Sequence, residues 1–357
     1  MITLTLFFIP FIVAIGAFIF FHKEKFHIHE LIIQLSISAL VAIITSFIIT
    51  LGDTKDSEIW NGRIVNKISE RVSCSHSYPC NPHPCMCDKN GCQTCWDTCY
   101  DHSYDIDWNL YTNNMEKITI GRIDRQGLDQ PLRWTIARTG DTTSINHDYK
   151  NYVKANPDSL FAYDKNLIKK YKNKLLSYPN NIYDYHYLNR FIDRSNMFLN
   201  SVKMINDQLS YLNSDLGSLK QVNVILGIVL DKEEDFFDAQ EQYWKGGKKN
   251  DVILIISIDK DKNILWAKVM AFSKNQMIKV SLRDDIEKLK NIKSKELEII
   301  NILRRNVIYY YNRKPMSDFD YLKDSIQPTT TQFTVSIIIN LIISVILSIV
   351  FIKNDFN

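Results

Sequence analysis

QVNVILGIVLDKEEDFFDAQEQYWKGGKKNDVILIISID, residues 221–259, is the stretch that decides the fold of the larger polar part of the chain. Its two ends, 221–230 and 251–259, are continuous apolar runs, as in strands buried on both faces of a sheet. The middle, 231–247, begins with acidic residues and ends with a glycine pair, as helices commonly do. Strand, helix and strand in this order predict a layered α/β domain, which we place at 155–330.

The flanking segments extend this pattern. Residues 196–217 carry apolar side chains at helical spacing, and Gly217 is expected to cap the C-terminal end of that helix. After the quoted stretch, 263–272 is expected to form a further strand, joined to 251–259 by a short polar turn. Helices are then expected at about 283–290, 295–312 and 317–325.

A short pattern, W-x-G…N-D-V followed by a hydrophobic run, closes the central helix and opens the next strand. It consists of Trp244, Gly246 or Gly247, Asn250, Asp251 and Val252. Together with a helix ending at Leu216–Gly217 and the strand Val222–Leu230, this pattern resembles the TPM domain family over roughly 195–325. The resemblance implies an extracytoplasmic α/β/α domain, often tethered by a C-terminal membrane helix. It also implies either a phosphatase, as proposed for some members, or an auxiliary or assembly factor for membrane complexes.

The residues of this pattern also have structural explanations. Gly246 and Gly247 suit a tight reversal that needs positive φ. Asn250 and Asp251 can bond backbone amides in the turn before the strand, and Trp244 can anchor the helix end against the sheet. The alternative is a binding site at this edge of the sheet.

Three charge-free segments are each long enough to cross a bilayer: 2–21, 31–51 and 333–352. They predict three transmembrane helices and hence a lipid bilayer as partner, although 2–21 could instead be a cleaved signal peptide. The loop 22–30 carries Lys23 and Lys25, which favours a cytoplasmic location for it. The region between the second and third helices is therefore expected outside the cytoplasm, either in the periplasm or at the cell surface.

All seven cysteines lie within a single stretch of 26 residues, in a region at 52–150 that we expect to be cysteine-rich and β-structured. Three histidines lie among or just after them. The candidate residues are Cys74, Cys80, Cys85, Cys87, Cys92, Cys95, Cys99, His76, His83 and His102. An oxidising location favours disulfides, whereas four Cys or His ligands would suit Zn²⁺. A redox-active Cys92-x-x-Cys95 is a third alternative. Because seven is odd, a disulfide framework leaves one thiol free, paired with another chain, or bound to metal.

The same layout of Cys74–Tyr78, Cys95–Tyr100, His102 and Trp108 ahead of an α/β domain resembles uncharacterised membrane proteins of tailed bacteriophages and their hosts. Between the cysteines and that domain, the segments 104–112, 116–124 and 132–139 alternate apolar and polar residues. They predict a small antiparallel sheet.

Catalytic motifs are missing from the sequence: it contains no GxSxG, P-loop, HExxH or GxGxxG. Four acids at the predicted C-terminal ends of strands could bind Ca²⁺ or Mg²⁺, although the sequence favours a charged helix start and a solvated turn as their explanation. These are Asp231, Glu234, Asp235 and Asp259. The net charge of +3, from 43 Lys and Arg against 40 Asp and Glu, gives no indication of nucleic-acid binding.

The sequence thus predicts a membrane-anchored extracytoplasmic protein that binds or assembles a protein partner, encoded by a phage and acting at the host envelope if the second resemblance holds. Two alternatives stay open. One is a metal-dependent phosphohydrolase that uses the four acids, and the other is a zinc-binding membrane protein that faces the cytoplasm.

Overall fold

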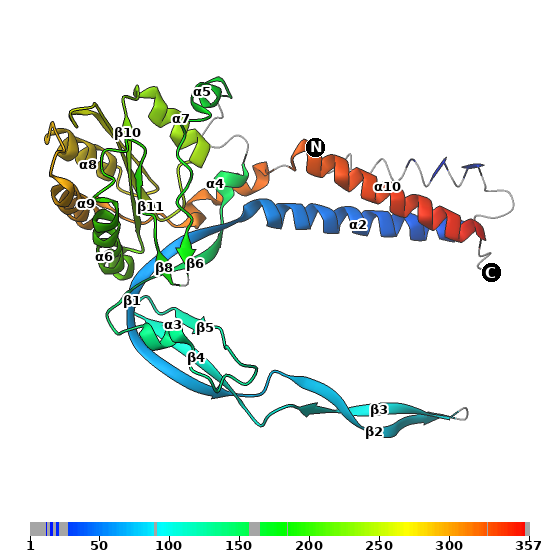
Figure 1. Cartoon of the computed structure of the whole chain (residues 1–357). Helices are drawn as coiled ribbons and strands as arrows, with labels where there is room; N and C mark the ends of the chain where they lie inside the picture. The colour runs from blue at the N-terminus through cyan, green and yellow to red at the C-terminus, as the bar shows by residue number, and fades with distance from the viewer. Residues whose placement is uncertain are drawn as a thin grey trace. The chain divides into compact units, whose positions relative to one another are not determined.

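The computed structural model describes residues 12, 15–16, 19–20, 28–88, 91–156, 165–183, 185–326 and 328–353 (Figure 1). They form two compact units. The first, here called the helical unit, contains residues 1–57, 148–166 and 315–357; the second, the sheet unit, contains 58–147 and 167–314. Most of the predicted β region and most of the predicted α/β domain thus belong to one unit.

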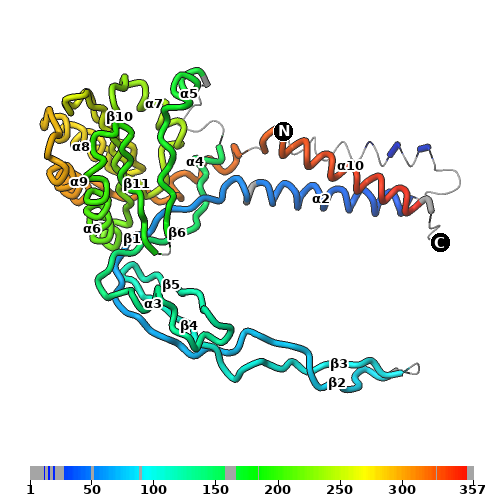
Figure 2. Tube along the Cα trace, in the orientation of Figure 1, coloured from blue at the N-terminus to red at the C-terminus, as the bar shows by residue number. Residues whose placement is uncertain are grey.

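Two long apolar helices dominate the helical unit: α2 (Ile28–Thr54) and α10 (Thr330–Lys353). Both are long and apolar enough to cross a membrane, as predicted for 31–51 and 333–352. They lie side by side in both views (Figures 1 and 2). The predicted span 2–21 and the loop 22–30 lie largely outside the described residues, so two of the three predicted spans are seen.

The two long helices contact each other through polar and small residues, whereas large apolar side chains face outward. Every fourth residue of each helix is buried in this contact: Glu30, Gln34, Ser38 and Ala42 on α2, and Ser336, Asn340, Ser344 and Ser348 on α10. The Gln34 amide donates to the Ser344 carbonyl (2.9 Å) and to the hydroxyls of Ser344 (2.8 Å) and Ser348 (2.9 Å). A polar interior with an apolar exterior is the arrangement expected of helices packed in lipid.

Two four-stranded sheets form the framework of the sheet unit. The first has the order β5-β4-β1-β6 and the second β12-β11-β10-β9. The strands of the first are β1 (Lys55–Val72), β4 (Asp105–Thr112), β5 (Lys117–Ile120) and β6 (Thr142–Lys150). Those of the second are β9 (Phe191–Asp193), β10 (Asn223–Leu230), β11 (Asp251–Ile258) and β12 (Ile264–Ala271).

Two short antiparallel ribbons and several helices complete the molecule. The ribbons are β2 (Ser77–Asp88) with β3 (Gly91–Tyr100), and β7 (Ile182–Tyr183) with β8 (His186–Tyr187). The helices are α3 (Leu132–Ile136), α4 (Tyr152–Ala155), α5 (Lys165–Tyr171), α6 (Val202–Lys220), α7 (Asp235–Trp244), α8 (Met277–Glu287), α9 (Glu296–Tyr310) and the 3₁₀ helix η1 (Met316–Ser325).

The second sheet is covered on both faces, which confirms the layered α/β arrangement predicted from 221–259. Strand β10 runs parallel to β11 and β9, and β12 pairs antiparallel with β11. Alternate residues of the central strands enter two separate cores. Val224 and Leu226 pack with α6, α8 and α9, whereas Ile225 and Val229 pack with α7 and the segment around Leu176. Strands buried on both faces need this continuous apolar sequence.

Two sequence predictions were wrong for identifiable reasons. Residues 132–136 form the helix α3, not a strand, with Pro131 as the N-cap residue whose carbonyl accepts from the Thr135 N–H (3.0 Å); β1 and β6 supply the remaining strands of the first sheet. Helix α6 does not stop at Gly217 but continues to Lys220, with Gln221 as its left-handed cap (φ 50°). Gly217 is instead a position of close packing against Asn61.

Candidate functional site

The cysteine-rich hairpin β2–β3 continues the pairing of β1 with β4, since one pair of strands leads directly into the other (Figure 1). Three disulfides cross it: Cys80–Cys99, Cys85–Cys95 and Cys87–Cys92. The prediction of disulfides is confirmed for these six residues. Cys92 and Cys95 bond to different partners, so they do not form a redox-active CxxC pair.

Side chains of this hairpin are exposed on both faces. None of its residues belongs to the hydrophobic clusters of the described chain. Its aromatic residues are open to solvent, with 48% of Tyr78 and 56% each of Trp96 and Tyr100 exposed. The strands therefore keep their pairing through hydrogen bonds and disulfides, without a core beneath them.

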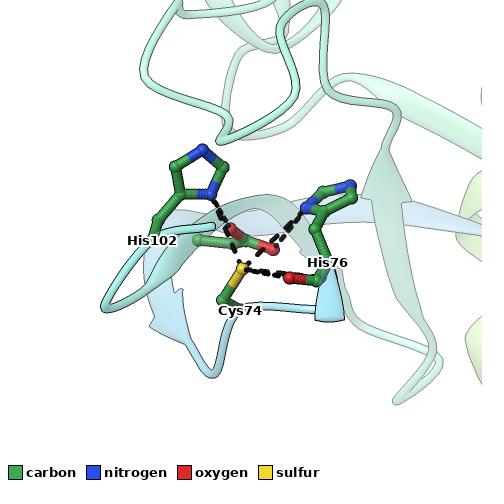
Figure 3. A group of neighbouring side chains, drawn as sticks. Cys74, His76 and His102 are labelled. Atoms are coloured by element: carbon green, nitrogen blue, oxygen red, sulfur yellow. Dashed lines mark hydrogen bonds and ion pairs between the residues drawn. The ribbon is translucent and has the colours of Figure 1, made fainter. Parts of the chain in front are cut away.

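Cys74 is the seventh cysteine and lies at the base of the hairpin, where it is buried and forms no disulfide. Three other side chains meet it there: His76 and His102, which Figure 3 labels together with Cys74, and Asp105. We call these four residues the base cluster. Cys74 and His76 lie between β1 and β2, whereas His102 lies between β3 and β4 and Asp105 begins β4. The cluster thus joins the two chain segments that enter and leave the hairpin.

Short distances separate the polar atoms of the base cluster. Cys74 Sγ lies 3.5 Å from His102 Nδ1 and 4.0 Å from His76 Nδ1. The Asp105 carboxylate lies 3.3 Å from His102 Nδ1 and 3.6 Å from His76 Nδ1. The four atoms lie within 4.8 Å of one another, and no other group of His, Cys, Asp or Glu in the described residues has such a geometry. Such an arrangement can act as a hydrogen-bonded network or hold one metal ion.

Asp105 is fully buried and is held by groups outside the cluster. Its Oδ2 accepts hydrogen bonds from the Ser75 N–H (2.9 Å) and hydroxyl (3.1 Å), and from Arg122 Nη1 (2.6 Å). The Ser75 N–H and Arg122 hold the pKa of Asp105 well below its usual range, although burial opposes them. The carboxylate is therefore ionised near neutral pH, with Oδ1 left to face His102.

Sequence reasoning named three of the four cluster residues and missed Asp105. The available signal was its spacing from His102, since C-x-H followed by H-x-x-D gives two close ligand pairs separated by a long loop. His83, which was grouped with the others, lies in mid-hairpin beside Asp97 (3.7 Å). The six disulfide cysteines are likewise excluded as ligands.

The four acids predicted to bind a cation have different surroundings. Asp235 pairs with Lys170 (2.6 Å) and accepts from Tyr171 (2.5 Å), and these hydrogen bonds lower its pKa. Glu234 lies 3.4 Å from Lys268. Asp259 accepts from Asn263 and Asp261 in its own turn, as expected of a hairpin loop. Asp231 adopts positive φ (48°) at the end of β10. Cation binding by these residues stays a prediction.

The residues of the W-x-G…N-D-V pattern serve the turn between α7 and β11. Gly246 (φ 79°) and Gly247 (φ 85°) both adopt positive φ. The Asp251 carboxylate accepts from the Lys248 N–H (2.7 Å), the turn role predicted for it. Asn250 differs, because its amide donates to the Ile59 carbonyl in β1 (2.7 Å).

Trp244, the remaining residue of this pattern, is buried at the end of α7 and packs edge-on against Tyr178, with ring centroids 5.7 Å apart. Its indole N–H has no hydrogen-bond partner in the described chain. It therefore anchors the helix end through packing alone.

Comparison of the whole chain with protein-family models, curated proteins and solved structures finds no match to any of them. The resemblances to the TPM family and to phage-encoded membrane proteins therefore stay predictions. The conclusions about function rest on the geometry of the hairpin, its base cluster and the two apolar helices.

Proposed function

We propose that this chain is a membrane-anchored extracytoplasmic protein that binds a protein partner through the hairpin β2–β3. The observation that carries the proposal is the combination of three cross-strand disulfides with exposure on both faces. A hairpin with no core beneath it is marginally stable in water. Covalent cross-links keep this one in a single conformation, and preorganisation lowers the entropic cost of binding.

The chemistry of the hairpin favours a protein as its partner. Tyr78, Trp96 and Tyr100 are exposed, and aromatic side chains of this kind are enriched at the centres of protein interfaces. Residues 77–88 and 91–100 contain Asp88 and Asp97 but no Lys or Arg. Nucleic acid and anionic lipid both require cationic side chains for binding. The strands thus lack cations and the turn between them contributes only Lys89, which disfavours both of these ligands.

Anchoring in a membrane and location outside the cytoplasm are supported by different features. Helices α2 and α10 expose apolar side chains and bury polar ones, which favours lipid as their surroundings. Disulfides persist in oxidising compartments and are rare in the cytosol, so the three bonds of the hairpin disfavour the cytoplasm-facing alternative. The phosphohydrolase alternative gains no comparable support, because Asp235 and Asp259 are already engaged by neighbouring groups.

Site-specific photo-crosslinking in cells that express the full chain tests this proposal. A benzophenone amino acid at position 96 is expected to yield a discrete adduct with a membrane or envelope protein. The matched control is position 309, because Tyr309 is at least as exposed as Trp96 but lies on α9 in the α/β layers. Adducts at both positions in equal yield, or at neither, would contradict a binding role for the hairpin.

Accessibility in intact cells tests the location separately. A membrane-impermeant amine reagent is expected to label Lys203, whose side chain is 90% exposed, while the cytoplasmic membrane is intact. Labelling that requires permeabilisation of the cytoplasmic membrane would place the sheet unit in the cytoplasm.

A further inference from the structure

The base cluster contains the residue types that zinc prefers, in a number that completes a coordination sphere. A thiolate, two imidazoles and a carboxylate give four ligands, and structural zinc sites are almost always four-coordinate and tetrahedral. Oxygen-seeking cations such as Ca²⁺ and Mg²⁺ do not select sulfur and imidazole. The ligand set is therefore selective for a transition metal, and for zinc in particular.

Distances within the base cluster match a tetrahedron around zinc. Ordinary zinc–ligand bonds place two N or O ligands about 3.3 Å apart and an N and an S ligand about 3.6 Å apart. The observed separations are 3.3 Å for His102 Nδ1 and Asp105 Oδ1, and 3.5 Å for Cys74 Sγ and His102 Nδ1. Two further pairs are longer: His76 Nδ1 lies 3.6 Å from Asp105 Oδ2 and 4.0 Å from Cys74 Sγ. All four ligand atoms lie within 4.8 Å of one another, so the longer separations must shorten when a metal binds.

Surrounding groups already hold the ligands in the required state. Asp105 presents Oδ1 to the cluster, while Ser75 and Arg122 bind Oδ2, which is the outer-shell support common around metal ligands. The backbone N–H of His76 donates to Cys74 Sγ (3.4 Å) and so helps to fix the position of the sulfur. One thiolate and one carboxylate would balance the two positive charges of Zn²⁺.

The position of the cluster explains why a metal would be useful there. None of the four residues belongs to the hydrophobic clusters of the described chain. The hairpin above them is cross-linked by disulfides, whereas its base has a single thiol and no cross-link of its own. Small folded regions that lack a core commonly depend on a metal or on disulfides for stability.

We infer that Cys74, His76, His102 and Asp105 form a structural zinc site that fastens the base of the hairpin. The site uses both Nδ1 atoms, and four protein ligands leave no open position for substrate. This inference does not depend on the proposed binding function. A zinc site also explains why the number of cysteines is odd. Cys74 is too buried to form a disulfide with another chain, and three further side chains that can bind a metal lie beside it.

Metal analysis of the full chain, purified in detergent and dialysed against a competing chelator, tests the inference. The wild type is expected to retain about one zinc ion per chain, and Cys74→Ser and Asp105→Asn to retain about tenfold less or lower still. The matched control is His83→Ala, which removes a histidine from the hairpin but not from the cluster and is expected to retain zinc. Mass spectrometry under non-reducing conditions confirms that each variant keeps its three disulfides.

Cobalt substitution provides a readout that misfolding alone would not imitate. The wild type with Co²⁺ is expected to show tetrahedral d–d bands and a thiolate-to-cobalt charge-transfer band. Cys74→Ser is expected to lose the charge-transfer band. The inference is overturned if wild type binds no zinc, if another metal occupies the site in its place, or if His83→Ala loses zinc to the same extent as Cys74→Ser.

Discussion

Gly217 on α6 packs directly against the backbone of Asn61 on β1. A Cβ atom on this glycine would lie 2.6 Å from the carbonyl carbon of Asn61 and 2.8 Å from its Cβ, both far inside van der Waals contact. Asn61 is itself buried and donates to the Val222 carbonyl (3.1 Å). Absence of a side chain at 217 therefore lets the helix approach the strand.

Substitution of this glycine should destabilise the sheet unit. Gly217→Ala is expected to lower the free energy of unfolding by about 2 kcal/mol, because the strand must shift to admit a methyl group. Urea unfolding of the full chain in detergent, followed by tryptophan fluorescence, measures the change. Gly121→Ala is the control, since a Cβ there meets no atom within 4 Å. Equal unfolding midpoints for the two variants would refute the packing role.

The buried carboxylate of Asp251 should make stability depend on pH. Burial raises the pKa of Asp251 to about 6 from its ordinary 3.8, although Asn223, Lys248 and Tyr178 donate to it. Between these values the folded state binds more protons than the unfolded state, so this residue makes folding less favourable as pH rises. The stabilisation that protonated Asp251 gives to the folded state is therefore fully present below about pH 4 and is lost above about pH 6.

Comparison with Asp251→Asn isolates this effect from other acids. The variant lacks the titration, so its stability relative to wild type should increase by about 3 kcal/mol between pH 4 and pH 7. Urea unfolding at both pH values gives the difference. A constant difference between the two proteins would show that Asp251 does not titrate in this range.

Loss of the outermost disulfide should open the hairpin without unfolding the rest. The double variant Cys80→Ser with Cys99→Ser removes a bond that closes a separation of 19 residues, worth about 3 kcal/mol in the chain-entropy description. Hydrogen exchange of amides in β2 and β3 should then accelerate by roughly 100-fold. Amides of β10 and β11 are the internal control, and their acceleration by the same factor would contradict independent opening.

The hydrogen bonds of Gln34 should stabilise the pair of long helices. Gln34→Leu removes three contacts to Ser344 and Ser348 and leaves their hydroxyls without this donor, which is expected to cost about 1 kcal/mol. Unfolding of the full chain by a denaturing detergent measures this cost. Ser36→Ala serves for comparison, because that exposed hydroxyl bonds only the Ile32 carbonyl of its own helix. An equal loss in both variants would argue against an interhelical role for Gln34.

Local sequence patterns correctly predicted the strands and helices that consist of continuous runs of apolar residues. Strands at 221–230 and 251–259 and the long helices near 31–51 and 333–352 follow from continuous hydrophobicity, and the structure has them with small differences at the ends. Gly217 was misjudged because a glycine near a helix end has the same local signature whether it caps the helix or admits a neighbour. Only the distant residue Asn61 distinguishes the two.

Residues of the base cluster illustrate the same limit. The sequence shows that Cys74, His76 and His102 are of metal-binding type, but six neighbouring cysteines are of that type as well. Pairing of β2 with β3 places those six cysteines opposite one another, where they form disulfides. Pairing of β1 with β4 brings Asp105 next to Cys74, the one remaining thiol. Neither pairing can be read from residue types alone, so only the spacing C-x-H followed by H-x-x-D could have distinguished these four residues from the other candidates.

Nesting of the three disulfides has a consequence for biogenesis. Cys87–Cys92 lies within Cys85–Cys95, which lies within Cys80–Cys99, so each bond joins residues already brought close by the one inside it. Closing such short loops costs little entropy and is fast. All three bonds can therefore form while the ribosome is still synthesising the α/β layers, and a nascent chain arrested once the hairpin has entered the oxidising compartment should already be fully oxidised.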